Sequence, residues 1–149
     1  MSLSTILTIE TVAVGLHSRD KHGIINELLD ILVRAGSIND KPAALKAILE
    51  REDKMSTGMK YGIAIPHGKT ETVPSLVACV GISTEPIPFD TLDGKPARIF
   101  IMTLSPPEKT GPHLQFLAEV SQLFKSASRR DAAISARTPA ELLSVITAK

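Results

Sequence analysis

The stretch SLVACVGISTEPIPFDTLDGKPARIFIMTL, residues 75–104, holds two continuous apolar runs, SLVACVGIS (75–83) and ARIFIMTL (97–104). Strands of this composition are typical of a sheet that is covered on both faces, because neither side of the pleat is polar. Between the runs, Asp93-Gly94 is a pair that favours a tight turn. The stretch therefore predicts two buried strands, at least one antiparallel pair, and hence a mixed sheet.

Helical patterns lie on both sides of this stretch. Apolar residues recur at helical spacing before it and after it, and capping residues stand at the expected helix starts, Asn39 or Asp40 at one and Thr138 at another. Helices interspersed with covered strands predict an α/β fold, a three-layer sandwich in which a mixed, mostly buried β-sheet is flanked by helices on both faces. The predicted elements are a strand at residues 11–14 and helices at 18–36, 39–52, 110–126 and from 138 onward.

The helix predicted at residues 110–126 has an apolar face. Leucines, a valine and a phenylalanine recur on it at helical spacing, and Pro112 lies just inside its start, where proline is favoured. The residues expected on this face are Leu114, Leu117, Val120, Leu123 and Phe124.

Length and composition indicate one domain, residues 1–149, with an aliphatic core. Apolar residues make up 43% of the chain but aromatic residues only 3%, and the net charge is +1, which argues against a nucleic-acid partner. Cys79, the only cysteine, lies in an apolar run and is interpreted as core filler in a reducing compartment. With no signal peptide and no apolar stretch of roughly 18–20 residues, the chain is expected to be cytoplasmic and not inserted in a membrane.

Two of the four histidines stand beside residues that restrict the backbone. His67 lies between a proline and a glycine in YGIAIPHGKT (61–70), at the end of a short apolar run. His113 follows a Gly-Pro pair at a predicted helix start, where unpaired N–H groups suit an anion. The pattern leaves two interpretations open, structural turn histidines or a pair of reactive groups. His17 and His22 are interpreted as surface residues.

Several kinds of site have no motif in this chain. The histidines lack the H-E-x-x-H or H-x-H spacing and the cysteine partners of common metal sites. Neither the G-x-S-x-G of many serine hydrolases nor a phosphate-binding glycine loop is present. The sequence therefore predicts no metal and no cofactor.

Two longer segments together carry a resemblance. ILEREDKMSTGMKYGIAIPHGKT (48–70) and PHLQFLAEVSQLF (112–124) resemble the fructose/mannitol-type IIA domain of the bacterial phosphotransferase system, including its nitrogen-regulatory branch. In that family the histidine of the P-H-G element accepts a phosphoryl group, which the resemblance places at His67. The family's second active-site histidine falls on His113, and the arginine of its Arg-Glu pair falls on Arg51. A solvated charge at the helix end is the alternative interpretation of Arg51.

The resemblance implies a phosphotransferase that forms a phosphohistidine intermediate. An HPr-type protein would donate the phosphoryl group to His67, and a IIB domain or regulated target proteins would act downstream. The run SPPEKTGPHLQFL (105–117) favours the regulatory branch, with a sugar-uptake IIA component as the alternative and a non-catalytic interaction domain as a third possibility. The chemistry is reasonable for these residue types, since a neutral imidazole is nucleophilic near pH 7 and a guanidinium can neutralise phosphoryl oxygens.

The loop before His67 departs from the family pattern. Lys60 and Tyr61 replace a small, flexible pair that many relatives carry, so the loop is expected to differ in shape and in how a partner docks on it. The sequence alone assigns no role to the neighbouring Ser56, Thr57 and Lys69.

Overall fold

Strands β4 (Val77–Ile87) and β5 (Ala97–Ser105) form the antiparallel pair that the two apolar runs predict. In the computed structural model, which describes residues 3–148, Val80 lies opposite Ile101 and both side chains are buried. The connection between the strands is longer than a two-residue hairpin loop. The turn at Asp93-Gly94 lies within it, where the Gly94 N–H donates to the carbonyl of Thr91 at 3.1 Å.

The sheet is mixed, as predicted. Its order is β1–β4–β5–β2, and β3 also pairs with β5. Strand β1 (Val12–Leu16) runs parallel to β4, whereas β2 (Ile63–Ala64) and β3 (His67–Lys69) run parallel to β5. Strands β2 and β3 therefore follow one another along the same side of β5, separated only by residues 65 and 66.

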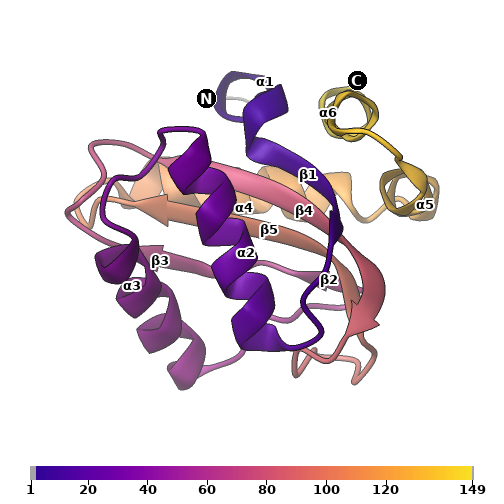
Figure 1. The fold of residues 1–149 in the computed structure, drawn as a ribbon, viewed down its shortest axis with the longest axis horizontal. Helices are drawn as coiled ribbons and strands as arrows, with labels where there is room; N and C mark the ends of the chain where they lie inside the picture. Colours follow the sequence, from indigo (N-terminus) through magenta and orange to yellow (C-terminus); the bar gives the residue numbers. More distant parts are fainter. Residues whose placement is uncertain (1–2, 149) are drawn as a thin grey trace.

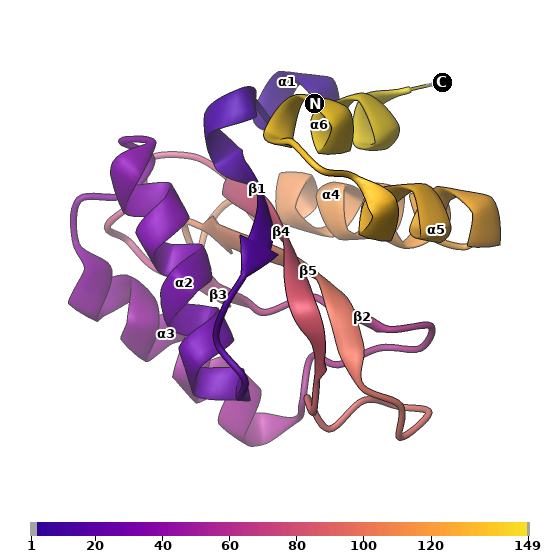
Figure 2. The same ribbon diagram turned by 45° about the vertical axis from the view of Figure 1, so that its right-hand side comes forward.

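Helices cover both faces of the sheet, which confirms the three-layer sandwich (Figures 1 and 2). Helices α2 (Lys21–Arg34) and α3 (Lys41–Lys54) pack on one face, where Leu28 and Ile48 meet Phe100 in one core cluster. A second cluster on the opposite face contains side chains from the remaining helices. These are α1 (Leu3–Ile6), α4 (Thr110–Leu123), α5 (Ala127–Ser135) and α6 (Pro139–Thr147), and a 3₁₀ turn at Ile9–Thr11 precedes β1.

The buried face of α4 differs from the expected one. His113, Phe116 and Val120 point into the protein, whereas Leu114 is 61% exposed. The helix carries two adjacent stripes at helical spacing, and the stripe that is buried begins with a histidine instead of a leucine. Of the predicted face, Val120 and Phe124 are buried and Leu117 and Leu123 pack against the core, so the prediction is wrong only at Leu114. The position that is buried in its place brings an imidazole into the interior.

Cys79 is fully buried in the core, and burial raises the pKa of its thiol. Helix α5, which no pattern predicted, is short and lies between α4 and α6. Within residues 3–148, no helix combines the length and the apolar character that crossing a bilayer requires.

Candidate active site

Strand β3 places His67 beside helix α3. The strand begins at His67, which lies opposite Thr103 of β5. At the next position, a Cβ on Gly68 would lie only 2.9 Å from the backbone carbonyl atoms of Ala47 in α3, closer than real Cβ contacts. Glycine is therefore required because the helix backbone packs directly on the strand. This contact brings the C-terminal half of α3 close to His67.

The ring of His67 is oriented by the backbone just before it. Its Nδ1 lies 2.8 Å from the carbonyl oxygen of Ile65. A carbonyl can only accept a hydrogen bond, so Nδ1 is the protonated nitrogen. In the neutral ring the lone pair is then on Nε2, which leaves Nε2 as the nucleophilic atom.

His113 faces His67 from the first turn of α4. The two rings meet edge to face with their centroids 5.6 Å apart. His113 is only 3% exposed, and its Nδ1 lies 2.7 Å from the hydroxyl oxygen of Ser105. Its Nε2 is buried and has no hydrogen-bond partner among residues 3–148. A buried polar atom without a partner costs about 1–3 kcal/mol, so this nitrogen suits a ligand group that approaches His67.

Both rings are held in their neutral form. Burial lowers the pKa of His67, and the positive charge of Arg51 adds to this effect, while the Ile65 carbonyl and Glu52 oppose it. Burial lowers the pKa of His113 to about 4, with further contributions from His67 and Lys69. At neutral pH the site therefore contains two neutral imidazoles, one of which has a free lone pair.

These shifts predict a dependence of stability on pH. The histidines bind protons more weakly in the folded protein than in the unfolded chain, whose histidine pKa is about 6.5, so the free energy of unfolding should fall as pH decreases from about 7 towards 4. Denaturant unfolding across this range measures the slope. The His113→Gln variant, which cannot titrate at this position, should show a shallower decline. An equal slope in both proteins would contradict the lowered pKa of His113.

The two histidines open onto a pocket of about 330 Å³ between α3, β3 and α4. Three basic side chains line it, and Glu50 is its one carboxylate among the described residues. Lys69 also donates from Nζ to the hydroxyl oxygen of Thr110 at 2.9 Å. The pocket therefore favours a small anion. Its lining residues are Ala47, Glu50, Arg51, Lys54, His67, Gly68, Lys69, Thr110, His113, Leu114 and Leu117.

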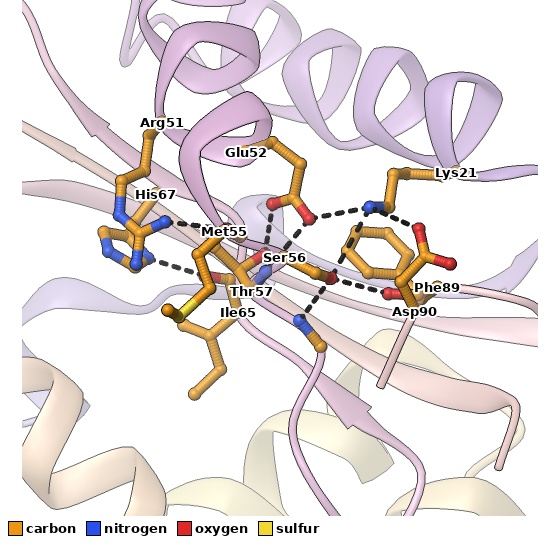
Figure 3. Close-up of polar contacts among 11 residues, drawn as sticks. Lys21, Arg51, Glu52, Met55, Ser56, Thr57, Ile65, His67, Phe89 and Asp90 are labelled. Carbon is orange, nitrogen blue, oxygen red and sulfur yellow. Dashed lines mark hydrogen bonds and ion pairs between the residues drawn. The ribbon is translucent and has the colours of Figure 1, made fainter. Parts of the chain in front are cut away.

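Arg51 reaches this pocket from the last turn of α3. Its Nη1 donates to the carbonyl oxygen of Met55 at 2.8 Å, and its guanidinium lies beside the ring of His67 (Figure 3). Arg51 lies at the helix end, as the alternative interpretation also has it, but its side chain lines the pocket beside His67. The structure brings together all three residues singled out in the sequence, His67, His113 and Arg51, although they come from three different elements.

A buried carboxylate that sequence reasoning missed lies directly behind the pocket. The side chain of Glu52 is 4% exposed and forms an ion pair with Nζ of Lys21 at 2.8 Å. It also accepts hydrogen bonds from the backbone N–H of Thr57 at 2.9 Å and from its hydroxyl at 2.5 Å (Figure 3). The available signal was spacing, because Glu52 continues the buried stripe of Ala44 and Ile48 at intervals of four residues.

Lys60 and Tyr61, where the loop before His67 departs from the family pattern, lie outside the pocket. Tyr61 and Gly62 have φ values of 64° and 76°, and the N–H of Met59 donates to the carbonyl of Ile63 at 2.7 Å across this tight turn. The Tyr61 ring packs against the guanidinium of Arg130 with 4.3 Å between Cζ and the ring centroid. Neither Lys60 nor Tyr61 lines the pocket of His67.

Within residues 3–148, no group of three or more His, Cys, Asp and Glu side chains is arranged to hold a metal ion.

Comparison with known proteins gives the family. The family described as "Phosphoenolpyruvate-dependent sugar phosphotransferase system, EIIA 2" matches residues 5–149. The chain belongs to this family. A fructose-specific EIIA component from Haloferax volcanii is 38% identical over 136 residues, which are 91% of this chain and 88% of that protein. A fructose-specific EIIABC component from Bacillus subtilis is 32% identical over 98% of this EIIA chain, which spans only 23% of that longer protein.

Solved structures give the same fold. The nitrogen regulatory protein IIA-Ntr from Neisseria meningitidis superposes on this EIIA family member with a TM-score of 0.90 at 27% sequence identity. The alignment covers 97% of this chain and 99% of that chain. Both sugar-specific and nitrogen-regulatory proteins are therefore among its relatives.

Proposed function

We propose that this EIIA family member is a phosphohistidine carrier that accepts a phosphoryl group on Nε2 of His67 from an HPr-type donor protein. The observation that carries the proposal is the hydrogen bond between Nδ1 of His67 and the carbonyl of Ile65, because it leaves the lone pair on Nε2. This nitrogen belongs to a residue that lines a pocket rich in basic side chains.

The transfer exchanges one N–P bond for another. Nε2 of His67 attacks the phosphorus atom, the donor's N–P bond breaks, and its bonding pair leaves with the donor imidazole. The phosphorylated ring of His67 then carries a positive charge shared with Nδ1–H. The Ile65 carbonyl, 2.8 Å from Nδ1, stabilises that charge. The hydrogen bond to the Ile65 carbonyl therefore orients the nucleophilic ring before transfer and stabilises the phosphorylated ring after it.

The neighbouring side chains would neutralise the transferred group. In-line phosphoryl transfer depends on positioning and on stabilising the negative charge of the equatorial oxygens. Arg51 offers a planar set of N–H donors, and Lys54 and Lys69 add positive charge at the wall of the pocket. His113 can donate from its unpartnered Nε2 once the Ser105 hydroxyl donates to its Nδ1.

The proposal is tested by incubating the protein with radiolabelled phosphoenolpyruvate, the donor enzymes and HPr. We expect stoichiometric, acid-labile labelling that requires HPr. Peptide mapping at alkaline pH should place the label on His67. No labelling by any HPr-type donor, or labelling that maps elsewhere, would overturn the proposal.

Two physiological roles use the same chemistry. The regulatory role, which the sequence favoured, is supported by the similarity to the Neisseria IIA-Ntr structure, and a sugar-uptake role is supported by the identity to the fructose-specific EIIA component. Incubating the labelled protein with a fructose-type IIB domain distinguishes them. Rapid loss of label to IIB supports sugar uptake, whereas label retained on the protein supports regulation.

Replacing His113 should slow the transfer moderately. We expect His113→Ala to reduce the labelling rate about tenfold, because a neutral N–H contributes one ordinary hydrogen bond to the transferred group. His113→Gln, whose amide can donate at a similar distance, should lose less. Rapid-quench kinetics measure the rate, and His22→Ala, at an exposed position of α2, is the control. A rate for His113→Ala within about twofold of wild type would remove this role.

A further inference from the structure

Glu52 does not contact the pocket, yet the chain buries its charge close behind it. A buried carboxylate is costly unless it is paired, and a buried ion pair by itself is weak evidence of stabilisation. An aliphatic residue at this position would continue the stripe of Ala44 and Ile48 without that cost. The hydrogen bonds of the carboxylate are therefore the better explanation of its presence.

Those hydrogen bonds converge on the segment that follows α3. Both carboxylate oxygens of Glu52 accept from Thr57, one from the backbone N–H at 2.9 Å and the other from the hydroxyl at 2.5 Å. Lys21 balances the charge at 2.8 Å from one of these oxygens. Hydrogen bonds from Lys21 and Thr57 outweigh the effect of burial and hold the pKa of Glu52 below its usual value. The carboxylate is therefore ionised at neutral pH and holds Thr57 at two points.

Thr57 continues this connection to the strand that carries His67. Its carbonyl accepts a hydrogen bond from the backbone N–H of Ile65 at 3.0 Å. The carbonyl of the same Ile65 accepts the hydrogen bond from Nδ1 of His67. Glu52 is thus linked to the imidazole through Thr57 and Ile65, with each link a hydrogen bond (Figure 3).

From this arrangement we infer that Glu52 and Thr57 are positioning residues, which fix the Ile65 carbonyl and thereby select the Nδ1–H form of His67. The expected effect of these residues on the labelling rate rests on the proposed function, whereas their expected effect on the tautomer of His67 does not. The backbone N–H of Ile65 bonds directly to the carbonyl of Thr57, so a displacement of residue 57 changes the position of the neighbouring Ile65 carbonyl that the imidazole requires. Misplacement of a reacting group by about 1 Å can slow a reaction by about 10²-fold, so smaller shifts have measurable effects.

The ring itself can be observed without any phosphoryl donor. Long-range ¹H–¹⁵N NMR at pH 7.5 reports which ring nitrogen is protonated, and wild type should show a protonated Nδ1. Glu52→Gln cannot accept at both oxygens and should give a mixture of the two tautomers. Thr57→Val loses the hydroxyl but keeps the backbone bond to Glu52, so its shift should be smaller. Thr57→Ser, which restores the hydroxyl, should return the spectrum to that of wild type.

The labelling rates should follow the same order. We expect a decrease of about tenfold for Glu52→Gln, a smaller decrease for Thr57→Val, and a rate within about twofold of wild type for Thr57→Ser. Thr84→Val, at an exposed position of β4, is the matched control and should change neither readout.

The outcomes separate this inference from the proposed function. Wild-type tautomer populations in both folded Glu52→Gln and Thr57→Val would overturn the inference, even where His67 is labelled normally. If Glu52→Gln does not fold, Thr57→Val and its serine rescue decide the question. Altered tautomers in a protein that no donor labels would support the positioning role and reject the carrier function.

Discussion

His67→Ala is expected to take up no phosphoryl label under conditions in which the wild-type protein is labelled completely. The variant lacks the Nε2 atom on which the proposed N–P bond forms, and His113 cannot substitute for it. The Nε2 of His113 lies in a side chain that is 3% exposed, and its Nδ1 is occupied by Ser105. Mass spectrometry of the intact protein, which resolves the added phosphoryl group, measures the extent of labelling.

His22→Ala is the matched control for this experiment. His22 is exposed on α2 and does not line the pocket, so its replacement should leave labelling unchanged. Because His67 contributes a half-buried ring at the rim of the sheet, circular dichroism of His67→Ala should verify that the fold is kept. Complete labelling of a folded His67→Ala protein would show that the acceptor is a different residue.

Arg51→Ala should slow labelling by about 10²-fold, the largest decrease among the residues that do not form the covalent bond. A charged donor contributes about 1.5–3 kcal/mol through a hydrogen bond, compared with about 1 kcal/mol for a neutral donor such as His113. Part of the loss would come from the contact between Arg51 and the Met55 carbonyl, which steadies the segment after α3.

Arg51→Lys separates the contribution of the positive charge from that of the planar N–H donors, since lysine keeps the charge but not the planar set of donors. We expect its rate to lie between those of wild type and Arg51→Ala. Lys46→Ala, at an exposed position on the same helix, removes a positive charge away from the pocket and serves as the control. If rapid-quench rates for Arg51→Ala stay within about twofold of wild type, Arg51 does not stabilise the transferred group.

Much of the architecture could be predicted from local pattern. The apolar runs that become β4 and β5 have no polar face, so only a sheet covered on both sides can accommodate them. Helices α3 and α6 are capped by Asp40 and Thr138, whose side chains accept from backbone N–H groups in the first turn. Capping is a contact between neighbours in the chain, which is why sequence reveals it.

Other features depended on contacts between distant residues. The sequence suggested that Gly68 allows a turn or a close approach, and the structure shows the close approach to the backbone of Ala47. Leu114 was expected on the apolar face of α4, but the register of the helix on the sheet buries His113 in its place. Hydrophobic spacing does not distinguish two neighbouring stripes on one helix when both contain apolar residues.

The sequence by itself determined the layered α/β fold and the choice of His67, His113 and Arg51, since apolar runs, caps and a recognisable pattern are properties of short segments. Only the tertiary structure decided how these residues act together. It placed an unpaired ring nitrogen of His113 beside His67, fixed the protonated nitrogen of His67 on the Ile65 carbonyl, and linked that carbonyl to Glu52 through Thr57. Burial and hydrogen-bond geometry set these properties, and both arise only when segments far apart in the chain are packed together.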